Sequence, residues 1–157
     1  MRRVRTQPFV IVRAFIEKDG KFLLVQENWG HVKGLWNFPA GWLDLSEDPL
    51  AGAVREVKEE TGYDFTPEHL LGIYSFIKYS QSEKGQPVEF VYTGRVSGEQ
   101  SKIDHHEIKQ TRWFTPEEIM AMNESELRDK ISKRMLEDYL AGQRYPLEVV
   151  SHSKTNA

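Results

Sequence analysis

The sequence predicts an α/β fold in which one mixed sheet is flanked by helices. Segments rich in β-branched and aromatic residues, typical of strands, are interleaved with segments of helical periodicity, and the order lacks a regular strand-helix-strand repeat. The chain has 157 residues, which is within the usual size of one domain. No internal repeat or low-complexity tract divides it. We therefore expect residues 1–157 to form a single domain.

The first elements are predicted to form a hairpin. Residues 9–16 are β-branched and aromatic, and residues 21–26 are a second apolar run. Between them, Lys18-Asp19-Gly20 is a turn signal, so the two runs are expected to pair as antiparallel strands. After a polar, glycine-containing loop at residues 27–34, residues 35–39 are expected to be short and extended, ending at a proline.

The clearest helix is predicted at Pro49–Thr61. Asp48 can cap its first turn, Pro49 suits the first helical position, and Gly62 supplies a left-handed stop. Apolar side chains recur at helical spacing and should form one stripe facing the core. The members of this stripe are Leu50, Ala53, Val54, Val57 and Thr61.

The second half of the chain is predicted to add three strands and two helices. Thr115-Pro116-Glu117-Glu118 is typical of a helix start with a capping box. The strands are expected at residues 70–79, 88–96 and 108–114, with a polar loop at residues 80–87. The last helix is expected from about Ser125 to Ala141, with Gly142 as its stop.

The composition excludes several classes of protein. There is no cysteine, so disulfides, thiolate zinc sites and cysteine nucleophiles are excluded. The net charge of −3 argues against a nucleic-acid polymer as the main partner. No apolar stretch approaches the length of a membrane span or a signal-peptide core. The expected location is therefore the cytoplasm, with no membrane partner.

Three carboxylates of the predicted helix should lie together. At about 100° per residue, Glu56, Glu59 and Glu60 fall within an arc of about 100° beside the apolar stripe. Like charges so close destabilise a helix, and Glu59 and Glu60 also oppose the helix dipole in the last turn. The cluster is more readily explained if cations occupy it, and oxygen ligands suit Mg²⁺ or Mn²⁺. The alternative is a set of solvated surface glutamates.

The whole segment resembles the signature of the Nudix hydrolase family. The matching positions are Gly41, Glu47, Arg55, Glu56, Glu59, Glu60 and Gly62, while Tyr63 stands where the family has an aliphatic residue. The resemblance implies an α/β/α sandwich with a loop-helix-loop catalytic segment. It also implies a Mg²⁺-dependent enzyme, with Mn²⁺ possible.

The resemblance implies roles for particular residues. Glu56, Glu59 and Glu60 correspond to metal ligands, together with the backbone carbonyl of Ala40. Arg55 is expected to orient the glutamates and to contact Glu59 one turn away. Glu47, Gly41 and Gly62 correspond to structural positions of the loops.

A further acid is expected from a later loop. Many family members carry a glutamate shortly before a late strand, and Glu107, which precedes Trp113, resembles it. Glu107 is thus a candidate metal ligand or general base, or else a solvated loop acid. The adjacent His105 and His106 do not predict a zinc site, because the sequence has no further ligands at suitable spacing.

The resemblance implies hydrolysis of a phosphoanhydride bond in a small organic di- or triphosphate by attack of water on phosphorus. Residues 35–41 and 142–148 resemble those of NudJ-type bacterial Nudix phosphatases, which act on nucleoside di- and triphosphates and on pyrimidine or thiamine pyrophosphates. The tail at residues 142–148 can equally be a packing device. ADP-ribose hydrolases of the family typically carry a proline shortly after the signature, at the place that corresponds to Lys78-Tyr79-Ser80. This sequence has no proline there, which counts against an ADP-ribose hydrolase.

Two alternative functions stay open at this point. Tyr79 would suit a dinucleoside polyphosphate hydrolase, and the same fold occurs in binding modules that sense a nucleotide without cleaving it. Trp29, His31 and Lys33 are candidates for contacts with a base or phosphate, or are plain surface residues. The chain is expected to be a monomer or a homodimer.

Overall fold

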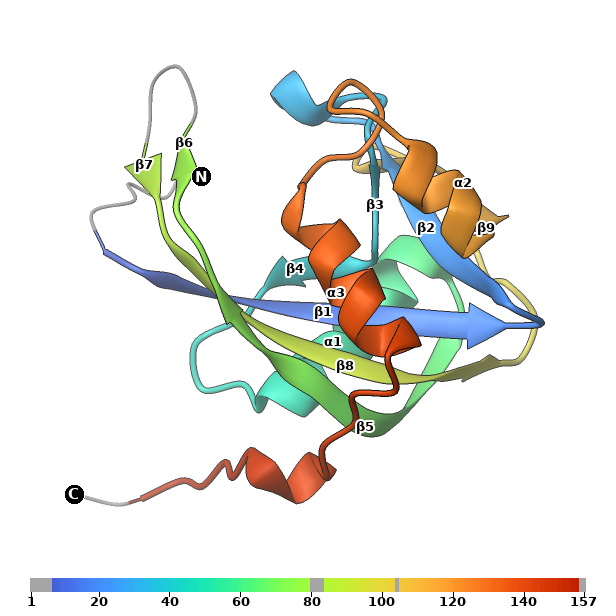
Figure 1. Cartoon of the computed structure of the whole chain (residues 1–157). Coiled ribbons are helices and arrows are strands. Elements are labelled where there is room, and N and C mark those ends of the chain that lie inside the picture. Colours follow the sequence, from blue (N-terminus) through green and yellow to red (C-terminus); the bar gives the residue numbers. More distant parts are fainter. Residues whose placement is uncertain (1–6, 80–83, 104, 156–157) are drawn as a thin grey trace.

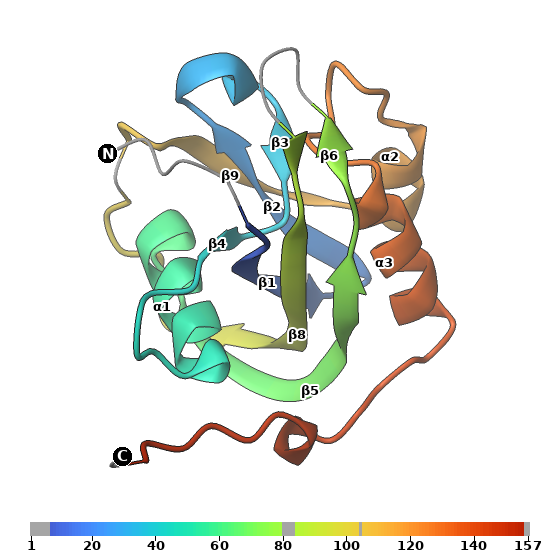
Figure 2. The same cartoon turned by 90° about the vertical axis from the view of Figure 1, so that its left-hand side faces the viewer.

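The computed structural model describes residues 7–79, 84–103 and 105–155, with only the backbone of Tyr79 and Lys84. Figures 1 and 2 show two perpendicular views of it. The strands are β1 (Phe9–Lys18), β2 (Lys21–Glu27), β3 (Trp36–Asn37), β4 (Ala40–Trp42), β5 (Asp64–Ser75), β6 (Lys78–Tyr79), β7 (Lys84–Gly85), β8 (Pro87–Ser97) and β9 (Ile108–Phe114). The helices are α1 (Pro49–Thr61), α2 (Pro116–Ala121) and α3 (Ile131–Leu140), with short 3-10 turns η1 (Gly30–Val32) and η2 (Leu147–Val149).

Seven strands form one mixed sheet, as expected. Its order is β3-β2-β1-β8-β5, with β4 on β1 and β9 on β2. Strand β8 runs parallel to β1, whereas β2 and β4 run antiparallel to it. The predicted hairpin is confirmed: its turn places Asp19 at φ 52° and Gly20 at φ 74°, a conformation that glycine adopts without strain.

The helices cover both faces of the sheet. In Figure 2, α1 lies on one side and α2 and α3 on the other. Side chains alternate along β1, so Val12, Ala14 and Ile16 join the core under α1, while Phe15 joins the core under α3. Strand β1 is thus shared by two apolar layers, which confirms the α/β/α sandwich.

Helix α1 has the bounds that the sequence predicts. The side chain of Asp48 accepts a hydrogen bond from Leu50 N, and Gly62 at φ 76° ends the helix in the left-handed conformation. Buried positions on its inner face include Ala53, Val57 and Thr61. The two caps set the ends of the helix and the buried face sets its rotation about its axis. Together they determine where the glutamates beside the apolar stripe lie.

Both ends of one predicted strand were wrong. The strand expected at residues 70–79 begins earlier, at Asp64, and ends at Ser75 before the separate β6. Register shifts near Pro67 and Leu70 interrupt its ladder with β8, which obscures the alternation in the sequence.

The last helix begins at Ile131 rather than near Ser125. Trp36 N donates to the Glu126 carbonyl, and Arg128 N donates to the Trp36 carbonyl. The backbone of residues 126–128 is therefore used by β3 and cannot make helical hydrogen bonds. The helix start predicted further upstream is confirmed: Thr115 and Glu118 form the capping box of α2.

The C-terminal tail lies against the outer strand of the sheet. Leu70 and Tyr145 exchange backbone hydrogen bonds of 2.9 and 2.8 Å, and Leu147 packs against the core under α1. The tail therefore covers part of the β5 edge, as its packing interpretation predicts. No helix in the described parts of the chain is long and apolar enough to cross a bilayer.

Candidate active site

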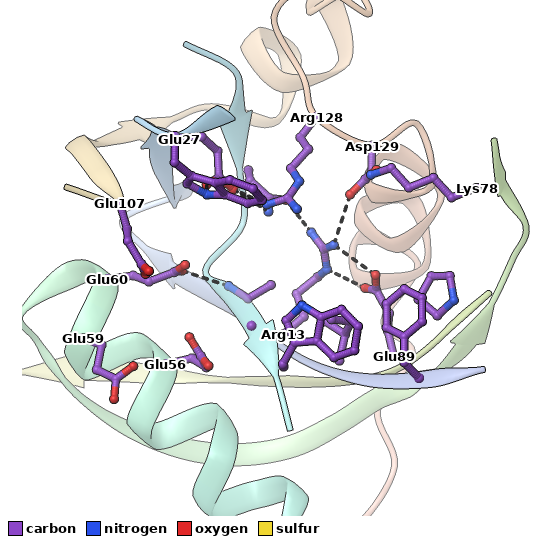
Figure 3. A pocket seen from close by; sticks show the side chains of 18 of the residues that line it. Arg13, Glu27, Glu56, Glu59, Glu60, Lys78, Glu89, Glu107, Arg128 and Asp129 are labelled. Atoms are coloured by element: carbon purple, nitrogen blue, oxygen red, sulfur yellow. Dashed lines mark hydrogen bonds and ion pairs between the residues drawn. The ribbon is translucent and has the colours of Figure 1, made fainter. Parts of the chain in front are cut away.

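A cavity of about 520 Å³ lies between α1, the ends of β1, β4 and β8, and the loop that precedes α3. Figure 3 labels most of the charged residues that surround it. One wall carries carboxylates of α1, and the far wall carries arginines paired with acids. The lining side chains that bear charge are Arg13, Glu27, Asp44, Arg55, Glu56, Glu59, Glu60, Lys78, Glu89, Glu107, Arg128 and Asp129.

The three glutamates of the predicted arc all line this cavity. They differ in exposure, because the arc runs from the core toward solvent. Glu60 is 9% exposed, the side chain of Glu56 is 13% exposed, and that of Glu59 is 58% exposed. Helix α1 thus presents two nearly buried carboxylates and one accessible carboxylate to the same space.

Arg55 binds several glutamates at once. Its Nε and Nη2 donate to Glu47 at 2.7 and 2.9 Å, and its Nη1 donates to Glu56 at 2.7 Å. Nη1 also reaches Glu59 at 3.2 Å, the contact expected one turn along the helix. The remaining donor bonds the Trp42 carbonyl at 3.1 Å. Arg55 therefore ties the loop before α1 to the acidic arc.

These bonds shift the ionisation of both partners. The hydrogen bond to Glu47 and the neighbouring Glu56 raise the pKa of Arg55, despite partial burial. The same Arg55 contact lowers the pKa of Glu47. Glu47 also accepts from Asp44 N at 3.0 Å. Both side chains stay charged, so the loop is held by charge-assisted hydrogen bonds.

Glu60 and Glu56 lie against the short strand β4. Ala40 N donates to Glu60 at 3.0 Å. A Cβ on Gly41 would lie 2.1 Å from the Glu56 carboxyl carbon, so only glycine leaves room for that carboxylate. The sequence predicted Gly41 as a loop position, and the structure adds that its missing side chain is the space for Glu56.

Burial disfavours charge on both inner glutamates. It raises the pKa of Glu56, against the opposing effect of Arg55, and nearby Glu59 and Glu107 raise it further. Burial also raises the pKa of Glu60 well above its usual range, with added repulsion from Glu27 and Glu56. Crowded carboxylates of this kind suit a hard divalent cation, whose charge would offset both effects.

The carboxylates are not arranged around a common point. In the described residues, no three His, Asp or Glu side chains form a group that could hold an ion. The reason is local: Arg55 binds Glu56 and Glu59, while Glu60 turns to Ala40 N. The residue types and their proximity fit a divalent ion. Each of these hydrogen bonds uses one oxygen of its carboxylate, so ion binding requires the carboxylates to turn toward a common point.

Glu107 lies at the same cavity, as its position before β9 predicts. Its loop is held by Asn28, whose N donates to the Glu107 carbonyl at 2.8 Å and whose Nδ2 donates to the His105 carbonyl at 2.6 Å. The Glu107 side chain is exposed. It faces the acidic arc of α1 from the opposite side (Figure 3).

The far wall contains a buried arginine that the sequence alone does not assign to the site. Arg13 is 2% exposed, and its Nε and Nη2 donate to Glu89 at 2.7 and 3.2 Å. Its Nη1 donates to Asn37 at 2.7 Å and to Ser132 at 3.3 Å. Asp129 lies 3.7 Å from Nη2. Burial opposes the charge, but Glu89 outweighs it and raises the pKa of Arg13.

A second buried pair lies beside it. Arg128 donates to Glu27, which is 1% exposed. Trp29 Nε1 donates to the same carboxylate at 2.9 Å, and the Arg128 guanidinium lies 5.6 Å from the Trp29 ring centre. Trp29 is 42% exposed and lines the cavity, so it is a ring held in place by buried charges.

Other candidates from the sequence lie elsewhere. His31 contacts Trp29 edge-on at 6.2 Å between ring centres, but neither His31 nor Lys33 lines the described cavity, and both are exposed. The Tyr79 side chain lies outside the described part of the chain.

The missed residues did leave a signal in the sequence. Arg13 interrupts the apolar run of β1, and Glu89 interrupts that of β8. A charge inside a buried strand needs a partner, so two such interruptions indicate a buried pair. Arg128 and Asp129 carried no comparable signal, because residues 125–141 were interpreted as helix.

Comparisons with known proteins agree on one family. The family model described as NUDIX domain matches residues 6–138. The chain is 33% identical over 145 residues to the protein named phosphatase NudJ of Escherichia coli strain K12, covering 92% of this chain and 91% of that protein. A NUDIX hydrolase from Nitrosomonas europaea superimposes with a TM-score of 0.85 at 36% identity, covering 94% of this chain and 98% of that one. A MutT NUDIX hydrolase from Burkholderia pseudomallei has a TM-score of 0.70 at 26% identity, covering 84% and 98%.

Proposed function

Because the chain belongs to the Nudix family of hydrolases, we propose that it cleaves a phosphoanhydride bond in a small organic diphosphate or triphosphate with Mg²⁺ as its cofactor. Family members generally use divalent metal ions. The observation that carries the proposal is the burial of Glu56 and Glu60 at a cavity that also receives Glu59 and Glu107.

The ion would be held by Glu56, Glu59 and Glu60 and by the Ala40 carbonyl, with Glu107 as a further candidate ligand. When bound, a divalent ion neutralises phosphate oxygens and lowers the pKa of a coordinated water. Mn²⁺ satisfies the same oxygen ligands. The acidic wall would otherwise repel a polyphosphate, so its charge is consistent with an anionic substrate only when cations are present.

The protein side chains have separate tasks in this reaction. Arg55 keeps Glu47, Glu56 and Glu59 in place through its hydrogen bonds. A carboxylate takes the proton of the attacking water, and the exposed Glu107, held by its loop, is the candidate for this base. The water oxygen forms a bond to phosphorus, and the bond from phosphorus to the bridging oxygen breaks. The bridging oxygen leaves on the phosphate or organic phosphate that is released.

We also propose which phosphorus is attacked. The relative at 33% identity is named a phosphatase, which supports attack on the terminal phosphorus and stepwise release of inorganic phosphate. The nucleoside di- and triphosphates and thiamine pyrophosphate are the substrates to test first. Residues 1–157 are proposed to act as one domain, and a cytoplasmic location remains a prediction.

A product screen tests the proposal. The protein is incubated with nucleoside di- and triphosphates, dinucleoside polyphosphates, nucleotide sugars and thiamine pyrophosphate, with and without Mg²⁺, in ¹⁸O-labelled water. The proposal predicts Mg²⁺-dependent release of inorganic phosphate that contains the label. Pyrophosphate as the sole product would contradict attack on the terminal phosphorus, and no hydrolysis of any compound would contradict the function.

A further inference from the structure

The floor of the cavity away from α1 is one face of the sheet. Phe9, Ile11 and Arg13 alternate along β1, so they share a face, and all three line the cavity. Ile11 is paired with Trp42 on β4 and with Glu89 on β8. Paired residues on adjacent strands face the same side. Trp42, Ile11 and Glu89 therefore form a single row across three strands, which we call the floor row.

The floor row is apolar at one end and charged at the other. Trp42 stacks on Phe9 with 4.3 Å between ring centres, and Ile11 lies in the middle. Glu89 ends the row about 10 Å from Trp42, since it is two strands away and each strand spacing is about 4.8 Å. A planar ring lying over Ile11 would thus have an aromatic stack beside it and a carboxylate at its far edge.

The row lies next to the proposed phosphate site. On β4, Trp42 follows Ala40 by two residues, so both are on the same face of the strand. Ala40 N is bonded to Glu60 of the acidic arc. An organic group attached to a phosphate at the arc therefore reaches the floor row directly along β4.

Glu89 is fixed in place and still has capacity to accept hydrogen bonds. Among the described residues, each of its oxygens accepts one hydrogen bond, both from Arg13, whereas an ionised carboxylate has about four acceptor positions. The five donors of Arg13 are directed at Glu89, Asn37, Ser132 and Asp129. Arg13 is thus committed to these partners, and the group that it presents to the cavity is the carboxylate of Glu89.

We infer that the floor row is the subsite for the organic part of the substrate, and that Glu89 selects a flat nitrogen heterocycle carrying an exocyclic amino group. The inference rests on the proposed function, since it places the phosphates at the acidic arc. An ionised carboxylate only accepts hydrogen bonds. It therefore favours a ring edge that donates N–H and repels a ring edge that presents a carbonyl oxygen.

Matched pairs of nucleotides test the selection on the unmodified protein. Cytidine and uridine diphosphates differ at C4, amino against carbonyl, and in the hydrogen that uracil carries on the neighbouring N3; adenosine and inosine diphosphates differ in the same way at C6 and N1. The amino member of each pair should have a kcat/KM higher by between about 10-fold and 100-fold, the range for a hydrogen bond to a charged group. Equal values within each pair would overturn the inference even if both compounds are cleaved.

Substitution of Glu89 assigns the effect to this residue. In Glu89→Gln, Arg13 should retain the amide oxygen and leave the NH₂ group toward the cavity, so the preference should fall below about 3-fold or reverse. Glu117→Gln, on the exposed surface of α2 outside the cavity, is the control and should keep the wild-type ratio. An unchanged ratio in a folded Glu89→Gln protein would overturn the assignment.

A binding measurement separates this inference from the proposed function. Tryptophan fluorescence is titrated with the four nucleoside diphosphates in the presence of Mg²⁺, and dissociation constants are compared within each pair. Tighter binding of the amino members without any hydrolysis would support the subsite while contradicting the proposed reaction. Hydrolysis with no difference in either kcat/KM or affinity within a pair would support the proposed reaction while contradicting the subsite. If Glu89→Gln does not fold, the comparison on the unmodified protein decides.

Discussion

Replacement of Gly41 by alanine is expected to lower activity strongly while leaving the fold intact. The new Cβ would lie 2.1 Å from the Glu56 carboxyl carbon and 2.2 and 2.3 Å from its oxygens. A normal contact is about 3.5 Å, so the carboxylate must retreat by about 1.4 Å. Metal–ligand distances tolerate only about 0.2 Å, and a misplacement of about 1 Å can cost about 100-fold in rate. We therefore expect Gly41→Ala to lower kcat by about 100-fold or more.

The same substitution should have little effect on stability. Gly41 does not have a positive φ, so alanine can adopt its backbone conformation. The atoms that the new Cβ would crowd are the carboxyl group at the end of the Glu56 side chain, which can move without disturbing the backbone. A compatible Gly→Ala change stabilises by about 0.4–1 kcal/mol through the unfolded chain, which offsets part of the cost of moving Glu56. Stability is measured by thermal melting in chelator, and turnover by release of inorganic phosphate.

Gly72→Ala is the matched control. This glycine is also in a strand, and its Cβ would lie 3.0 Å from the Tyr74 ring and 3.3 Å from the Gln143 amide, outside the cavity. It should therefore keep normal turnover. Normal turnover and a normal Mg²⁺-induced rise in melting temperature in Gly41→Ala would contradict this expectation, because they would show that neither hydrolysis nor Mg²⁺ binding depends on the position of the Glu56 carboxylate.

Three further outcomes follow from the structure. Glu59→Gln should lower turnover by about two to four orders of magnitude yet change the free energy of unfolding by under about 0.5 kcal/mol, since its side chain is exposed; normal turnover would remove Glu59 from the site. Burial opposes ionisation of Asp129, but the charges of Lys78 and Arg13 outweigh burial and lower the pKa of Asp129. The ionised Asp129 therefore stabilises the fold fully above its unfolded pKa of about 3.9, and this stabilisation is lost as the pH falls through the lower pKa of the folded state. Urea titrations of the wild type and Asp129→Asn should therefore converge in acid, and a constant difference would contradict this. Burial raises the pKa of Tyr92 to about 12, and its hydroxyl is without a hydrogen-bond partner among the described residues, so Tyr92→Phe should stabilise by about 1 kcal/mol; a loss of stability in denaturant titration would reveal a missing partner.

The elements that the sequence predicted well are those with local signals at both ends. The two ends of α1 are set by residues that adjoin them, namely Asp48 and Pro49 at the start and Gly62 at the end. These ends could therefore be predicted without knowledge of the tertiary structure. The capping box of Thr115 and Glu118 is equally local. The start of α3 was missed because the backbone of residues 126–128 is taken by β3, a contact between distant segments that periodicity does not report.

The same distinction applies to the cavity. Glu56, Glu59 and Glu60 lie on one helix, so their spacing alone predicted that they share a face. Arg13 and Glu89 are 76 positions apart, and their pairing depends on the parallel register of β1 and β8. A single sequence indicates that each needs a partner but not which one, so the far wall became visible only in the folded structure.

The acidic arc of α1 is proposed to bind the divalent ion on which hydrolysis depends. The most direct measurement removes metal with a chelator and then follows phosphate release and melting temperature as Mg²⁺ is added back. We predict no release in chelator, recovery of release with Mg²⁺ or Mn²⁺, and a rise in melting temperature that follows mass action and is smaller in Glu59→Gln. Full turnover in excess chelator, or a melting temperature that does not respond to Mg²⁺, would show that the acidic arc does not hold an ion needed for hydrolysis.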